Sequence, residues 1–207
     1  VHQKNKEYGI LSCIHLNADK DKILQLNCIC NQTVTDSAIF NDLYLGKLKE
    51  IYETKYVNAA AWLLPRSTIQ IVGGFDPIFF HYGEDDNYLH RTIFHNLKIG
   101  ICPHETIVHD MNINRPLYDT RELEILTLIA YTNPNISSNV KQDTFTHLRK
   151  AITSLIRGRK TAYNKHLNKF KILKKYKKDI FRSNIQNTKK GMSWLDNLPY
   201  PSINNDR

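Results

Sequence analysis

The pattern of apolar residues predicts short strands in the first half of the chain. Residues 10–16 form an apolar run of strand length, and residues 97–101 and 106–108 have the composition of two further short strands. Pro103 lies between those two and marks a break, because proline lacks a backbone donor. The first half of the chain is therefore expected to contribute strands to a β-sheet.

Helical spacing dominates the second half. Residues 119–122, Asp-Thr-Arg-Glu, have the form of a capping box, and Asn133-Pro134 is expected to end the helix that they begin. A second helix is expected from about residue 138 to residue 157, with Gly158 stopping it. The apolar positions of that second helix are Val140, Leu148, Ile152, Leu155 and Ile156.

A third helical pattern follows and is strongly basic. Between Arg149 and Lys190 there are 15 Lys and Arg residues and one acidic residue, so the rest of a chain of net charge +9 sums to about −5. Two interpretations stay open: the helix attaches to an anionic membrane surface, or it packs on the rest of the protein with its lysines in solvent. Its apolar positions are Tyr163, Leu167, Phe170, Leu173 and Ile180, and the opposite face carries Lys165, Lys169, Lys175 and Lys178.

Composition narrows the class of protein. The 207 residues contain no apolar run near the length of about 18 that a membrane span needs, and Val1 is not followed by a signal peptide. Four cysteines lie in apolar, strand-like stretches without metal-type spacing, which favours reduced thiols and a cytoplasmic protein. These cysteines are Cys13, Cys28, Cys30 and Cys102.

Residues 73–91 carry the most chemical information. Gly73-Gly74 predicts a tight turn, and Phe79 and Phe80 are expected to enter a core. Three consecutive carboxylates, at residues 84–86, then stand where a helix should begin, because Tyr88, Leu89 and Ile93 recur behind them at helical spacing. A helix N-terminus stabilises negative charge even without a function, so the cluster alone also fits a well-capped surface helix.

An ordered series of short motifs surrounds this cluster. It comprises Tyr8-Gly9-Ile10-Leu11-Ser12, the segment 58–66 (Asn-Ala-Ala-Ala-Trp-Leu-Leu-Pro-Arg), Val72-Gly73-Gly74-Phe75-Asp76, Gly83-Glu84-Asp85-Asp86 with Arg91, and Ile107-Val108-His109-Asp110. The series covers about half of the chain and resembles the C-terminal half of family 2 glycosyltransferases. These are inverting enzymes that move a sugar from a nucleotide diphosphate to an acceptor. The resemblance implies an α/β, partial Rossmann-like (GT-A) fold with a C-terminal helical extension.

The resemblance also implies roles for residues around the triplet. Asp85 matches the carboxylate that accepts the proton of the acceptor hydroxyl, whereas Asn87 stands where a further Asp is usual. Arg91 is expected to brace the helix or to support the site from behind it. A histidine at the place of His109 joins the metal in several members of the family. The expected acceptor-binding residues are Trp62, Gly74, Asp76, Glu84 and Asp86.

The donor-binding half of such an enzyme is not evident in the sequence. Residues 19–21, Asp-Lys-Asp, match the letters of the metal-binding Asp-x-Asp element, but the residues around them predict a hairpin tip, so we reject the match. We expect roughly 90–100 preceding residues to hold the donor and, through Asp-x-Asp, most ligands of a divalent cation, Mn or Mg. Residues 1–117 would then be the acceptor-side half, 118–192 a helical basic extension and 193–207 a loosely ordered tail, although Trp194, Leu195 and Leu198 are apolar enough to dock.

The expected partners are therefore a nucleotide-diphosphate sugar and a saccharide or lipid-linked acceptor, with no nucleic acid. The setting would be cell-surface polysaccharide synthesis, on the cytoplasmic side and peripheral on the inner face of the plasma membrane. Exposed sheet surface predicts self-association to a homo-oligomer. The alternative is a basic nucleic-acid- or membrane-binding module without catalysis, although no groove-reading motif is present. A metal-dependent hydrolase built on His104, His109 and Asp110 would need further ligands.

Overall fold

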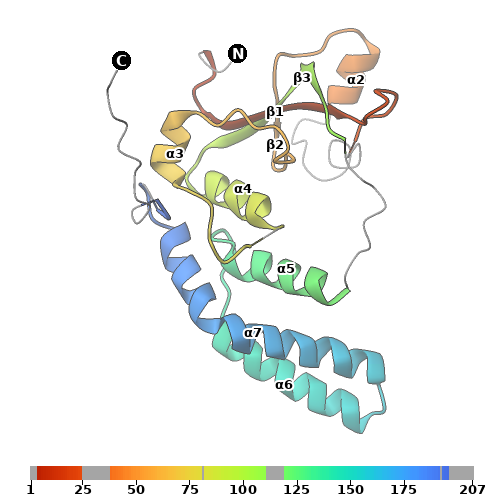
Figure 1. Ribbon diagram of the computed structural model, residues 1–207, viewed down its shortest axis with the longest axis vertical. Coiled ribbons are helices and arrows are strands. Elements are labelled where there is room, and N and C mark those ends of the chain that lie inside the picture. Colours follow the sequence, from red (N-terminus) through yellow and green to blue (C-terminus); the bar gives the residue numbers. More distant parts are fainter. Residues whose placement is uncertain (1–3, 25–37, 81, 111–118, 192, 196–207) are drawn as a thin grey trace.

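The computed structural model describes residues 4–24, 38–80, 82–110, 119–191 and 193–195. These residues form a mixed α/β fold with a small three-stranded sheet and six helices. Figure 1 shows the sheet at one end of the molecule and a pair of long helices at the other. The elements, in chain order, are β1 (Tyr8–Leu16), α2 (Ala38–Tyr44), β2 (Tyr52–Thr54), α3 (Arg66–Val72), α4 (Glu84–Phe94), β3 (Lys98–Val108), α5 (Asp119–Thr132), α6 (Val140–Ile156) and α7 (Lys160–Asn187).

The sheet has the strand order β1-β3-β2. The central strand, β3, runs parallel to β1 and antiparallel to β2. Because parallel strands need a long crossover, the chain between β1 and β3 has room for α3 and α4. The parallel pairing places the carboxyl ends of β1 and β3 side by side, which brings together residues that are about 90 positions apart in the sequence.

One sequence prediction about β3 is wrong. The two short strands expected at 97–101 and 106–108 are a single strand with an irregularity between them. Cys13 pairs with Cys102, but the next residue, Ile14, pairs with Thr106, so Pro103 and the two residues after it bulge out of the ladder. The missing donor of proline interrupts the hydrogen bonding locally, but the strand resumes beyond it.

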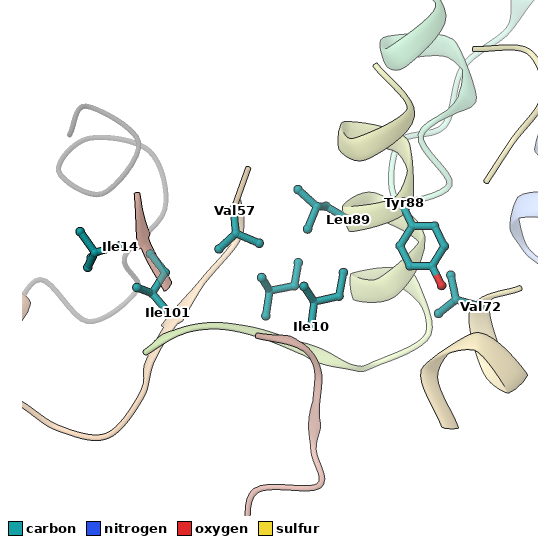
Figure 2. Close-up of a cluster of buried hydrophobic side chains, with 8 residues drawn as sticks. Ile10, Ile14, Val57, Val72, Tyr88, Leu89 and Ile101 are labelled. Atoms are coloured by element: carbon teal, nitrogen blue, oxygen red, sulfur yellow. The ribbon is translucent and has the colours of Figure 1, made fainter. Parts of the chain in front are cut away.

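The main core lies between the sheet and α4. Ile10, Ile14 and Ile101 from the sheet meet Leu89 and Tyr88 from α4 (Figure 2). The other buried members of this cluster are Val57, Val72 and Ile99. The helical spacing of the apolar residues in α4 is therefore confirmed as the face that covers the sheet, and α4 begins at Glu84 as expected.

The residues before α4 form tight, closely packed turns. Gly83 has φ +91° and caps α4, and a Cβ there would lie within 2.9 Å of Phe79. Phe79 is buried as expected, but the prediction for Phe80 is wrong because that side chain is almost wholly exposed. The first turn of α4 therefore follows a tight bend that requires glycine at position 83.

The Asp-Lys-Asp segment at 19–21 lies in a hairpin turn, as the sequence indicated. Asn17 donates its backbone N–H to the carbonyl of Lys22 at 3.0 Å, and its side-chain oxygen accepts from the N–H groups of Asp21 and Lys22. Lys20 adopts a left-handed conformation with φ +59°. The rejection of these residues as a donor-site element is consistent with this local geometry. Cys28 and Cys30 lie outside the described residues, while Cys13 and Cys102 are free thiols.

The second half contains the three helices expected there. α5 ends at Thr132 directly before Asn133-Pro134, and α6 ends before Gly158, which has φ +66°. The side chains of Asp119 and Thr120 lie outside the described residues, so the capping box stays a prediction. None of the described helices has both the length and the apolar character that a bilayer crossing requires.

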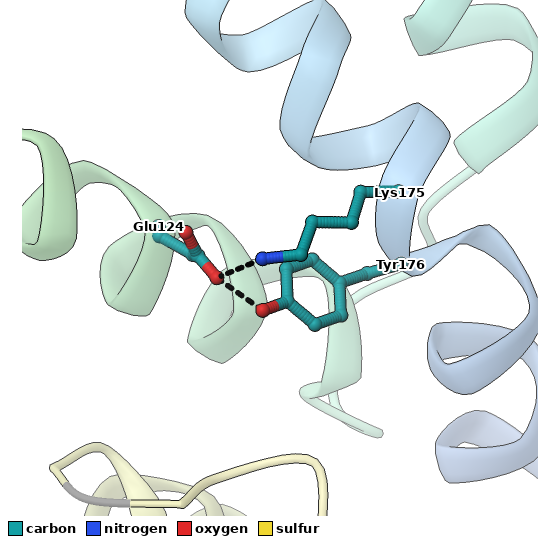
Figure 3. Close-up of polar contacts among 3 residues, drawn as sticks. All are labelled: Glu124, Lys175 and Tyr176. Carbon is teal, nitrogen blue, oxygen red and sulfur yellow. Dashed lines mark hydrogen bonds and ion pairs between the residues drawn. The ribbon is translucent and has the colours of Figure 1, made fainter.

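The apolar face of α7 packs on the rest of the protein. Leu173 and Ile180 are fully buried and meet Leu128 of α5 and Phe79 of the loop before α4. Outside this cluster, Glu124 of α5 accepts hydrogen bonds from Lys175, at 3.2 Å, and from Tyr176 (Figure 3). Of the two interpretations of the basic helix, packing on the body is therefore confirmed for the residues from Leu173 to Ile180.

The segment after α7 returns to the glycine turn. The N–H of Gly74 donates to the carbonyl of Ser193 at 2.8 Å, and the indole of Trp194 donates to the side-chain oxygen of Asn187 at 3.0 Å. A Cβ on Gly73, which has φ +87°, would lie 2.1 Å from the Ser193 carbonyl oxygen, and one on Gly74 would lie 2.8 Å from Leu195. The docking of Trp194 and Leu195 is confirmed, and Leu198 lies outside the described residues.

Candidate functional site

The acidic triplet forms the first turn of α4. Glu84, Asp85 and Asp86 are half-buried, and the N–H of Asp86 donates to a carboxylate oxygen of Asp85 at 2.9 Å. The positive end of the helix dipole favours their negative charge. Three adjacent carboxylates with partial burial nevertheless oppose one another, and this conflict appears in the pKa values of Asp85 and Asp86.

Burial is the main cause of the raised pKa values in this turn. It raises the pKa of Asp85, and the neighbouring charge of Glu84 raises it further, against the hydrogen bond from Asp86. Burial and the charges of Asp85 and Glu84 raise the pKa of Asp86 to about 6. One oxygen of Glu84 is buried without a hydrogen-bond partner among the described residues. Carboxylates in this state are suited to accept a proton or hydrogen bonds from a ligand.

An aromatic group includes Tyr88, which follows the triplet on α4. Tyr88, one helical turn beyond Glu84, has its ring 5.0 Å from that of Phe75 and 6.0 Å from that of Trp62. The rings of Trp62 and Phe75 are stacked at 6.5 Å. The indole N–H of Trp62 donates to the carbonyl of Val57, so the indole is fixed, and Phe75 is 49% exposed. Carboxylates next to a fixed, partly exposed aromatic surface can bind a ligand that has both apolar faces and hydroxyl groups.

Arg91 supports this turn from inside the protein. Its guanidinium is fully buried and donates to the carbonyl oxygens of Gly74, at 2.6 Å, and Val72. Burial lowers its pKa to about 10, although the Tyr88 and Asp76 charges act in the opposite direction. Arg91 therefore braces the glycine turn against α4, which agrees with the supporting role expected for it.

Two residues that were expected to bind an acceptor are part of the fold. Asp76 is 1% exposed, and its carboxylate accepts from the N–H of Ile78 and from the side-chain amide of Asn187. Gly74 uses its N–H for Ser193 and its carbonyl for Arg91. These internal partners explain both residues structurally, and contact with an acceptor stays a prediction for them.

Asn87 also has a structural explanation. It stands where the resembled family usually has Asp, and it is fully buried against α5. Its amide donates to the hydroxyl of Thr132 at 3.1 Å. A carboxylate at this position would place a buried negative charge beside a hydroxyl and the end of a helix, at considerable cost. The departure from the family pattern therefore fits the packing of α4 on α5.

His109 lies at the carboxyl end of β3, where its N–H continues the ladder to Leu16. Its ring is 5.8 Å from that of His15, edge to face, and its Nδ1 is buried without a partner in the described part of the chain. Burial, with a smaller contribution from His109, lowers the pKa of His15. Sequence reasoning missed His15, because only the parallel register of β1 and β3 brings it to His109.

The two histidines and the triplet form separate features. Across residues 4–24, 38–80, 82–110, 119–191 and 193–195, no group of three His, Cys, Asp or Glu side chains has the arrangement of a metal site. No hydrogen bond or ring contact in this part joins His109 to the first turn of α4. A small hollow of about 90 Å³ lies beside the loop before α4, and its lining includes Phe80, Tyr82 and Arg121.

A scan against protein-family models, a search of curated proteins and a search of solved structures each found no match. The assignment of function therefore depends on the residues and on their geometry. Those residues are the acidic turn of α4, the aromatic group at Trp62, Phe75 and Tyr88, and the brace at Arg91.

Proposed function

We propose that this chain is the acceptor-side part of a nucleotide-sugar-dependent glycosyltransferase. The enzyme would move a sugar from a nucleotide diphosphate to a saccharide or lipid-linked acceptor, with inversion, within a Rossmann-like GT-A fold. One observation carries the proposal: half-buried carboxylates with raised pKa values begin the helix whose Tyr88 joins a fixed aromatic group with Trp62 and Phe75. The mixed α/β fold is compatible with it.

Asp85 is the proposed general base. A base works best when its pKa lies closer to the working pH than that of a free carboxylate, and burial moves Asp85 in this direction. As a carboxylate it would accept the proton of an acceptor hydroxyl while that oxygen attacks the anomeric carbon and the nucleotide diphosphate leaves. The hydrogen bond from the N–H of Asp86 holds one of its oxygens in place and leaves the other for the acceptor.

The acceptor would lie across the aromatic surface. The stacked rings of Trp62 and Phe75 offer an apolar face to a sugar ring, and Phe75 is accessible. Glu84 and Asp86 would accept hydrogen bonds from further hydroxyl groups, because both lie in the first turn of α4, where they are only half-buried. The aromatic rings would therefore contact the apolar face of the sugar, and the carboxylates would accept hydrogen bonds from its hydroxyl groups.

The divalent cation expected for such an enzyme is not supplied with ligands by the described residues. His109 has a free buried nitrogen, and His15 is close to it, but two imidazoles and the exposed Asp110 do not make a three-ligand site here. We therefore derive no step through a metal. A role for His109 as one ligand would require others, such as an Asp-x-Asp element in a donor-binding half.

Transfer of sugar from labelled nucleotide-diphosphate donors tests the proposal, in a form of the protein that contains this chain and a donor-binding half. Asp85→Asn should lower kcat by about 10²–10⁴-fold with little change in KM, since it removes only the base. Asp179→Asn, an exposed carboxylate on α7, is the matched control. Glu84→Gln should move the acidic limb of the pH profile to lower pH, because the Glu84 charge raises the pKa of Asp85.

Binding of the acceptor is a separate measurement. The 207-residue chain should bind saccharides weakly, with a shift of the Trp62 indole signal in NMR, and Phe75→Ala should remove the binding. Phe40→Ala, a partly exposed aromatic residue on α2, is the control. Normal turnover by Asp85→Asn would refute the base assignment, and the lack of both transfer and saccharide binding would refute the enzyme class.

A further inference from the structure

Helix α6 carries a stripe of large apolar side chains on its outer face. Phe145, Ile152 and Ile156 recur at spacings of seven and four, so they share one side of the helix. They are 68%, 52% and 81% exposed, and Leu155 next to them is 61% exposed. Contiguous exposed apolar residues are uncommon on a protein surface. Where they occur, they commonly mark an interaction site.

The stripe is not needed for the packing of α6 on α7. The residues of α6 that are buried are small, Ala151 and Ser154, and neither belongs to the stripe. α7 uses its own apolar residues, Leu173 and Ile180, against α5. Both helices are therefore held in place without the stripe, which stays free for another partner (Figure 1 shows the pair at the end of the molecule away from the sheet).

The helix pair is strongly positive, and part of this charge lies at its turn. From Val140 to Asn187 there are 14 Lys and Arg residues and two Asp residues. A hollow of about 390 Å³ lies at the turn between α6 and α7, with a lining of cationic and hydroxyl side chains. The lining residues are Arg149, Lys150, Thr153, Ser154, Arg157, Arg159 and His166. Guanidinium groups and hydroxyls of this kind bind phosphate oxygens.

We propose that the α6–α7 turn docks on an anionic phospholipid surface. The stripe of Phe145, Ile152 and Ile156 enters the interface between headgroups and acyl chains, and the cationic hollow binds lipid phosphates. A second copy of the chain would bring two strongly positive surfaces together, which disfavours a dimer here. A nucleic acid would use the cations but not the apolar stripe. A lipid surface uses both.

This places the membrane contact on α6 and the turn, not on the lysine face of α7 that the sequence suggested. Flotation of the 207-residue chain with phosphatidylcholine vesicles, with and without phosphatidylglycerol, measures it. Binding should require the anionic lipid and fall with added salt. Ile152→Ser with Ile156→Ser should lower the vesicle affinity by about tenfold or more. Arg157→Ala and Arg159→Ala should each lower it by about fivefold.

Matched controls use exposed residues elsewhere. Leu126→Ser on α5 and Lys55→Ala after β2 should leave vesicle binding unchanged. Unchanged binding by the double serine variant would overturn the proposal, since charge alone would then suffice. Binding of inorganic phosphate without binding of vesicles would identify a free-phosphate site and overturn it too. Equal or tighter binding to single-stranded RNA, with no vesicle binding, would identify a nucleic-acid surface and have the same consequence.

Discussion

The guanidinium of Arg91 donates a 2.6 Å hydrogen bond to the carbonyl oxygen of Gly74. A second bond from the same group reaches the carbonyl of Val72. Arg91 is fully buried, so one side chain of α4 fixes both ends of the glycine turn in a region without water. This turn leads directly to Phe75, whose ring is an accessible part of the aromatic group with Trp62 and Tyr88.

Replacement of Arg91 by Lys should destabilise the protein by about 2–4 kcal/mol. An ammonium group cannot span two carbonyl oxygens as a planar guanidinium does, and it is costlier to bury. Chemical denaturation measures the loss in the free energy of unfolding. Arg66→Lys, at the exposed start of α3, should change it by less than about 0.5 kcal/mol. Equal effects of the two substitutions would show that Arg91 does not brace the turn.

Asp86 should make the protein less stable as pH rises. Its pKa is raised from 3.8 to about 6 in the folded state, so the folded state binds more protons than the unfolded state between these values. Stability is full below about pH 4 and is lost as pH rises through 6. Asp86→Asn should therefore stabilise the protein at neutral pH by on the order of 1 kcal/mol, after allowance for solvent screening.

Thermal unfolding of wild type and Asp86→Asn across this pH range provides the measurement. The difference in Tm should shrink toward pH 4 and vanish below it, where Asp86 is neutral in both the folded and the unfolded chain. Asp179→Asn, on the exposed surface of α7, should show no such dependence. If the Tm of Asp86→Asn exceeded that of wild type by the same amount at every pH, packing and not charge would be the cause of the difference.

Local signals in the sequence predicted much of the fold. The start of α4 at Glu84, the end of α6 before Gly158 and the hairpin turn after β1 all follow from residues within a few positions of each boundary. The bulge at Pro103 shows the limit of this reasoning. A break in local hydrogen bonding was visible, but the continuation of the strand depends on its partner, β1.

The sequence did not predict contacts between residues that lie far apart along the chain. His15 meets His109 only through the parallel register of two strands, and the partners of Asp76 come from α7. The apolar positions of α6 were visible in the sequence, but the sequence did not show which of them would be buried. The structure instead packs Ala151 on α7 and turns Ile156 outward, which no helical periodicity distinguishes.

Asn187 should be one of the most sensitive positions in α7. Its amide donates to Asp76, at 3.2 Å, and to the carbonyl of Thr132, at 3.1 Å, and its oxygen accepts from Trp194. Asn187→Ala would remove all three of these hydrogen bonds and should cost about 2–4 kcal/mol in unfolding free energy. Asn184→Ala, one turn earlier and only partly buried, is the control and should cost much less.

His147 and His166 should make the α6–α7 pair sensitive to acid. Their Nδ1 atoms are 3.0 Å apart, so one must carry the hydrogen and the other must be bare. Burial lowers the pKa of both below 6.5, and the charges of Lys150 and Lys169 lower it further, while Asp143 raises that of His147. The contact therefore stabilises the pair above about pH 6.5 and is lost as pH falls through the lowered pKa.

Between about pH 7 and pH 5 the Tm of wild type should fall relative to that of His166→Gln, because a glutamine cannot become charged. His104→Gln, an exposed histidine on β3, should leave the pH dependence unchanged. An equal fall in Tm for wild type and His166→Gln would assign the acid sensitivity to another part of the protein. The expected result would instead locate it at the helix pair whose turn we propose meets the lipid surface.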